Sequence, residues 1–127
     1  MSDAQARLQA LSEDFQKLQG ELQNAVASRQ KLEGQKQENV GVQQEFDRLQ
    51  DGETIYKLSG PVLLKQDKFE AENTVKGRLD FIGSEIIRLE SQIQETQEKL
   101  EKKKSEIIQI QSNAQAQAQG KGKEASQ

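Results

Sequence analysis

The sequence contains no cysteine, no histidine and no tryptophan, and it has only four phenylalanines, one tyrosine and one proline. The missing cysteine and histidine exclude disulfides, thiol nucleophiles, imidazole acid–base chemistry and zinc sites of the usual kinds. No phosphate-binding loop and no catalytic triad is found among the residues that remain. We therefore expect a protein that is not an enzyme and that holds neither a metal nor a cofactor.

Long apolar runs and a concentrated basic surface are also missing. No apolar stretch approaches the roughly 20 residues that a membrane-spanning helix needs, and Met1–Gln5 lacks the basic-then-apolar pattern of a signal peptide. The 18 basic residues are interspersed among 21 acidic ones, which gives a formal net charge of −3. Phosphate binding favours a concentrated basic face instead. We expect neither a membrane nor a nucleic acid as partner.

Two long stretches of the sequence carry a helical repeat. With 32% hydrophobic and 31% charged residues, the composition fits either disorder or long exposed helices. Ser2 and Gln5 resemble a capping box, and Asp51-Gly52 favours a helix terminus, so a helix is predicted from about residue 3 to about residue 50. The positions at coiled-coil spacing are Leu8, Leu11, Phe15, Leu18, Leu22, Ala25, Arg29 and Leu32, then, after a slip of the repeat, Gln35, Asn39, Val42, Phe46 and Leu49.

The second repeat follows Asp67, which with Glu70 has the spacing of a helix N-cap. A helix is predicted from about residue 67 to residue 113, and residues 114–127, which are rich in Ala, Gln, Gly and Lys, are predicted to be a disordered tail. Because every step of the repeat is three or four residues, disorder is disfavoured for both stretches. The second repeat comprises Val75, Leu79, Ile82, Ile86, Leu89, Ile93, Thr96, Leu100, Lys103, Ile107 and Ile110.

The two predicted helices are of similar length and flank a short connection, so we expect them to fold back on each other. Residues whose numbers add up to about 119 should then face each other, which brings Leu8 and Leu11 to Ile107 and Ile110. The predicted fold class is mostly α, an antiparallel two-helix coiled coil with a single β-hairpin at the bend. A parallel homodimer of one long helix is the alternative, and Pro61 disfavours it.

The connection, residues 53–66, reads ETIYKLSGPVLLKQ and is rich in residues that favour strands. Pairing across Ser59-Gly60 would place Tyr56 opposite Leu63 and Ile55 opposite Leu64. One face would carry Tyr56, Leu58 and Leu63, and the other Ile55, Val62 and Leu64.

Both faces of this hairpin are thus apolar, and the helices can cover one face at most. An isolated two-stranded hairpin is marginal in water, and its open edges invite pairing with other strands. We therefore predict that these six residues form a subunit interface, in which hairpins of several subunits join into a shared β-barrel. The alternative is that the hairpin only caps the two helices locally.

The run IYKLSGPVLLKQD at residues 55–67, placed between two helices of equal length, resembles prefoldin subunits of the beta class. The resemblance covers nearly the whole chain apart from the tail. It implies a hexamer of two alpha-class and four beta-class subunits, in which hairpins build a double β-barrel platform and paired helices extend from it. It further implies an ATP-independent cytoplasmic chaperone that captures unfolded proteins, such as actin and tubulin, and passes them to the group II chaperonin.

The same resemblance implies that unfolded client proteins are held near the free ends of the helices. In this sequence the apolar residues at those ends are Leu8, Leu11, Phe15, Ile107 and Ile110. They could instead be ordinary coiled-coil residues buried between the helices, and a purely structural or tethering coiled coil is the alternative function. A further open question concerns two pairs of glycines, which could serve close helix packing or flexibility: Gly34 and Gly41 on the first helix, and Gly83 and Gly77 on the second.

Overall fold

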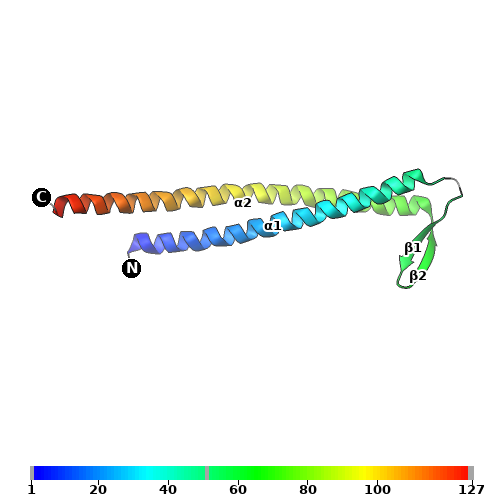
Figure 1. The fold of residues 1–127 in the computed structure, drawn as a ribbon, viewed down its shortest axis with the longest axis horizontal. Helices are drawn as coiled ribbons and strands as arrows, with labels where there is room; N and C mark the ends of the chain where they lie inside the picture. The colour runs from blue at the N-terminus through cyan, green and yellow to red at the C-terminus, as the bar shows by residue number, and fades with distance from the viewer. Residues whose placement is uncertain (1, 51, 126–127) are drawn as a thin grey trace. The chain divides into compact units, whose positions relative to one another are not determined.

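The structure is a computed structural model that describes residues 2–50 and 52–125. Its elements are α1 (Asp3–Arg48), β1 (Ile55–Ser59), β2 (Val62–Gln66) and α2 (Lys68–Ala125) (Figure 1). The fold is mostly helical, with two long helices and one antiparallel two-stranded hairpin between them, as the sequence predicts. No helix of the described residues is both long enough and apolar enough to cross a membrane.

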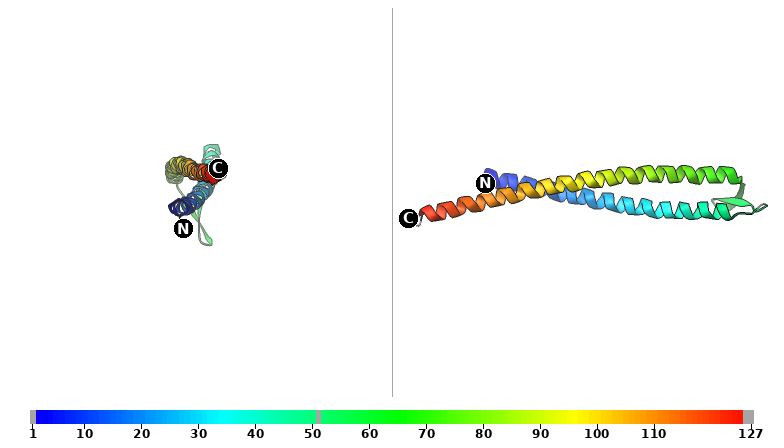
Figure 2. Two further views of the ribbon diagram at one scale, coloured as in Figure 1. Left: turned by 90° about the vertical axis from the view of Figure 1, so that its left-hand side faces the viewer. Right: turned by 90° about the horizontal axis from the view of Figure 1, so that it is seen from above.

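The chain divides into two compact units, and α1 and α2 each contribute a segment to both. The terminal unit comprises Met1–Val26 and Ser91–Gln127, and the hairpin unit comprises Ala27–Glu90. Within each unit the two helical segments lie side by side and antiparallel (Figures 1 and 2). Arg29 pairs with Glu90 at 2.8 Å in the hairpin unit, and Lys103 with Asp14 at 3.8 Å in the terminal unit. The residue numbers in each pair add up to within two of the predicted 119.

Side chains cap both helices at their N-terminal ends. The Ser2 hydroxyl accepts a hydrogen bond from the Gln5 amide at 3.2 Å, and the Gln5 side chain accepts one from the Ser2 amide at 3.3 Å. The Asp67 carboxylate accepts a hydrogen bond from the Glu70 amide at 3.3 Å at the start of α2. These bonds satisfy amides that have no partner within a helix. Asp51, part of the predicted end of the first helix, lies outside the described residues.

The C-terminal end of α2 differs from the prediction. The helix continues to Ala125, whereas the sequence pattern predicts that it ends at residue 113 and is followed by a disordered tail. Ala and Gln, which dominate this segment, have high helix propensity, and extending an existing helix needs no new nucleation step. Ser126 and Gln127, the last residues of the predicted tail, lie outside the described part of the chain.

The buried residues of each unit come from the apolar repeats and their immediate neighbours. Among the residues whose burial the structure describes, Thr96 is the only buried polar one, and its hydroxyl donates to the Gln92 carbonyl at 2.8 Å, so it is buried without losing a hydrogen bond. None of the described side chains is less than 2% exposed, because two helices cannot enclose the line along which they meet. The buried set is Leu11, Ala25 and Thr96 in the terminal unit, and Ala71, Val75, Ile82, Ile86 and Leu89 in the hairpin unit.

The hairpin register corrects one prediction. Leu58 pairs with Leu63 and Ser59 with Val62, so the two loop residues are Gly60 and Pro61 rather than Ser59 and Gly60. The predicted register would have placed Pro61 within a paired strand, where it has no amide hydrogen to donate. In the observed loop that hydrogen is not needed, and Gly60 has the positive φ of 59° that favours glycine at the first position of a type II′ turn.

The four glycines near the hairpin are not explained by close packing within the chain. A Cβ atom added at any of them would meet no atom within 4 Å: Gly34, Gly41, Gly77 and Gly83. Glycine inside a helix costs about 1 kcal/mol relative to alanine. These residues therefore lower the helical stability of the hairpin unit without a compensating contact in this chain.

We expect Gly34→Ala and Gly41→Ala each to raise the free energy of unfolding by about 1 kcal/mol, because alanine restricts the unfolded chain and fits the open space. Gly60→Ala is the matched control and should lower the free energy of unfolding by roughly 1–2 kcal/mol, because the φ of Gly60 is positive. Urea unfolding followed by circular dichroism measures both signs. A loss of stability in the two helix variants would contradict the open space found around Gly34 and Gly41.

Candidate functional site

The main exposed apolar surface of the hairpin unit lies on the hairpin itself, which projects away from the helix pair in two views (Figures 1 and 2). Of the six predicted interface residues, only Ile55 is half-buried, and it lines a space together with residues of both helices. The remaining five, which we call the hairpin surface, are between 51% and 69% exposed: Tyr56, Leu58, Val62, Leu63 and Leu64.

The hairpin surface occupies both faces of the two strands. Tyr56, Leu58 and Leu63 share one face, and Val62 and Leu64 share the other. The predicted division of faces is kept although the register differs, because the pairing is displaced by two residues and side chains alternate with a period of two. Leaving a large aliphatic side chain exposed forgoes roughly 2 kcal/mol of burial free energy. Contact with another protein would therefore bury this surface favourably.

The backbone of the hairpin offers a second means of association. The sheet has only two strands, so within the described residues each strand has one edge without a β-partner. Unpaired strand edges form hydrogen bonds readily with strands of other chains. The apolar side chains on both faces and the two open edges would allow the hairpin to join a sheet or barrel formed with other chains. The described residues of the single chain contain no such barrel.

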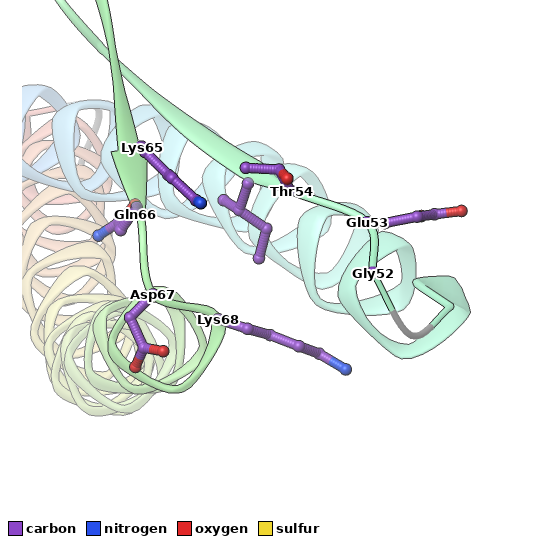
Figure 3. A pocket seen from close by; sticks show the side chains of 8 residues that line it. Gly52, Glu53, Thr54, Lys65, Gln66, Asp67 and Lys68 are labelled. Carbon is purple, nitrogen blue, oxygen red and sulfur yellow. The ribbon is translucent and has the colours of Figure 1, made fainter.

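A charged hollow of about 620 Å³ lies at the root of the hairpin, between residues 52–55 and residues 65–68 (Figure 3). Its charges have both signs: Glu53 and Asp67 are acidic, and Lys65 and Lys68 are basic. Asp67 is engaged as the cap of α2. The described residues contain no group of three or more side chains that could hold a metal ion. The hollow thus favours no single class of ligand.

The terminal unit carries an open groove between α1 and α2. It has a volume of about 410 Å³, and Leu8 and Ile110, two of the predicted client-binding residues, lie opposite each other in it. Ala4 and Ala114 extend its apolar lining, one helical turn beyond each of them. We call this feature the terminal groove.

The other three predicted client-binding residues do not line this groove. Leu11 is buried in the line of contact between the helices, and Phe15 and Ile107 are half-buried. Sequence reasoning missed Ala4 and Ala114 because alanine is a weak signal in an apolar repeat. Their spacing of four residues from Leu8 and Ile110 could have identified them.

Two arginines form the clearest ion pairs of the hairpin unit. The Arg29 guanidinium donates two hydrogen bonds to one carboxylate oxygen of Glu90, at 3.2 and 2.8 Å, which raises the pKa of Arg29. A hydrogen bond from Arg88 to Glu85 likewise raises the pKa of Arg88. Both guanidinium groups would be charged at physiological pH even without these hydrogen bonds. Arg29 joins the two helices, so its exposed ion pair with Glu90 fits their observed register.

The fold defines a class of protein in which two long helices are joined by a β-hairpin with exposed apolar side chains. The terminal unit adds an open groove between the helices. Comparison with known proteins identifies the particular family. Residues 9–114 match the family model described as Prefoldin subunit. The chain belongs to the prefoldin family, a family of chaperones whose subunits assemble with one another.

Relatives and solved structures agree with this assignment. The chain is 43% identical over 100 residues to prefoldin subunit 6 of Saccharomyces cerevisiae, covering 79% of this chain and 88% of that protein. It is 41% identical over 107 residues to prefoldin subunit 6 of Homo sapiens, covering 84% and 83%. The crystal structure of the prefoldin beta subunit from Thermococcus strain KS-1 superposes with a TM-score of 0.75 and 26% identity, covering 89% of this chain and 96% of that one. The predicted resemblance to beta-class subunits is confirmed.

Proposed function

We propose that this subunit joins alpha-class and other beta-class prefoldin subunits in a hexamer, and that its hairpin surface supplies the contacts. The observation that carries the proposal is the exposure of five large apolar side chains on both faces of one short hairpin. A barrel made from several hairpins would bury both faces and pair the open edges. Family membership adds independent support, because prefoldin subunits assemble with one another.

The assembled complex, in this proposal, captures unfolded proteins in the cytoplasm without ATP and passes them to the group II chaperonin. Clients of the actin and tubulin type fit such a chaperone. The terminal groove supports client binding because it is open, lined by four apolar side chains and three glutamines, and without charged lining residues. Binding an apolar side chain there needs no defined shape of the client, and contacts from several subunits would add up through avidity.

Reconstitution tests the proposal directly. We expect the chain, coexpressed with alpha-class and other beta-class prefoldin subunits, to give one hexameric mass by native mass spectrometry. The purified complex should suppress aggregation of chemically denatured actin without nucleotide, and transfer it to added chaperonin. A complex that assembles but leaves aggregation unchanged would favour the tethering coiled coil, and a chain that stays apart from the other subunits would contradict the proposed assembly.

A further inference from the structure

A crevice of about 280 Å³ lies between the hairpin and the helices of the hairpin unit. Val42 and Phe46 of α1 and Val75 of α2 form its apolar floor. Val42 occupies a position of the apolar repeat, yet it is 41% exposed, whereas Val75 is buried. The floor of the crevice is thus a part of the helix–helix contact line that this chain leaves open.

The rim of the crevice is positively charged. Lys57 of β1 and Arg78 of α2 both line it, and neither forms an ion pair with the described residues. By contrast, the other described arginines of this unit, Arg29, Arg48 and Arg88, each pair with a glutamate. An apolar floor beside two unpaired cations is complementary to an apolar side chain that has a carboxylate next to it.

We propose that this crevice receives an apolar side chain flanked by an aspartate or glutamate from a neighbouring prefoldin subunit. A cavity of about 150 Å³ accepts a benzene ring, so the space of about 280 Å³ accommodates an aromatic or branched side chain. Tyr56 belongs both to the hairpin surface and to the crevice lining, so a subunit docked on the hairpin reaches the crevice without a gap. The inference rests on the proposed role of the hairpin in assembly and adds a second contact to it.

The first test reverses the charges of the rim. Lys57→Glu combined with Arg78→Glu should weaken binding of this chain to its partner subunits at least tenfold, and the loss should shrink at high salt because like charges are then screened. Lys36→Glu combined with Lys76→Glu is the matched control: it makes the same charge change at exposed helical positions of the same unit that do not line the crevice. Fluorescence titration against the partner subunits measures the affinities, and circular dichroism checks that helix content is equal.

The second test identifies the occupant. Thr74 is an exposed residue of the crevice wall, and a photo-crosslinking amino acid placed there should capture a neighbouring subunit in the reconstituted complex without client. Mass spectrometry should map the crosslink to an apolar residue next to an acidic one. Wild-type affinity of the rim variant, or a crosslink that forms only with added unfolded actin, would overturn the inference. If a variant of the hairpin surface also binds with wild-type affinity, the proposed function fails as well, so the two failures are distinguishable.

Discussion

Replacing Leu58 and Leu63 with aspartate should reduce the affinity of the chain for its partner subunits by roughly a thousandfold. The two leucines lie directly opposite each other on one face of the hairpin and are 69% and 63% exposed. Burial of each is worth roughly 2 kcal/mol, so losing both removes about 4 kcal/mol, and every 1.4 kcal/mol is a factor of ten. An aspartate buried without a partner would add a further penalty.

Native mass spectrometry and titration against the partner subunits measure this loss. Helix content of the variant chain should stay unchanged, because both side chains are exposed and lie outside the helices. The matched control is Val26→Asp with Ile108→Asp, which places the same charges at two exposed apolar positions of the terminal unit. If the hairpin variant assembled as well as this control, the hairpin surface would not be the subunit interface.

The hairpin also shows what a sequence can predict and what it cannot. The alternation of side chains between two faces follows from strand geometry, so Tyr56, Leu58 and Leu63 share a face in the predicted and in the observed register alike. The register itself depends on which two residues form the turn. The run Ser59-Gly60-Pro61 offers two choices, and the deciding fact is that Pro61 has no amide hydrogen for the ladder.

For the helices, too, the sequence predicts one part of the structure and leaves another part open. Spacing of three and four residues predicts which side chains meet, and residues such as Ile82 and Ile86 are buried accordingly. The predicted register places Glu90 opposite Arg29, because their numbers add up to 119, but it does not specify the hydrogen bonds between them. Glu90 lies outside the apolar repeat, and its contact depends on how two long side chains cross the line between the helices. Such contacts are set by rotamers rather than by periodicity.

The sequence predicts the hairpin surface more fully than the terminal groove. The hairpin surface follows from the order of residues in the connection, since apolar residues on both faces of a short hairpin exceed what two helices can cover. The terminal groove was only partly foreseen, because Leu11 is buried whereas Leu8, from the same repeat, is only half-buried. Which repeat positions stay open depends on how far each helix extends past the other, and α2 runs past the predicted end.

Exchanging Leu8 and Ile110 for serine should weaken the contact between the terminal groove and an unfolded client by roughly thirtyfold. The two residues face each other across the groove and are already half-buried, so each loses about half of the burial free energy of a large aliphatic side chain, about 2 kcal/mol in total. Leu11 is left intact, because it is buried and its replacement would destabilise the helix pair instead. Binding of a labelled unfolded peptide to the reconstituted complex measures the affinity.

Ile108→Ser is the control that distinguishes binding in the terminal groove from nonspecific binding to any exposed apolar side chain. Ile108 lies two residues before Ile110 on α2 and is more exposed, at 53%, but it does not line the groove. If clients bind any exposed apolar side chain, Ile108→Ser should weaken binding at least as much as Ile110→Ser. If the groove is the site, Ile108→Ser should leave peptide affinity and suppression of aggregation unchanged, whereas Ile110→Ser reduces both. Equal losses in the two variants would contradict the terminal groove as the client-binding site, even with the hexamer intact.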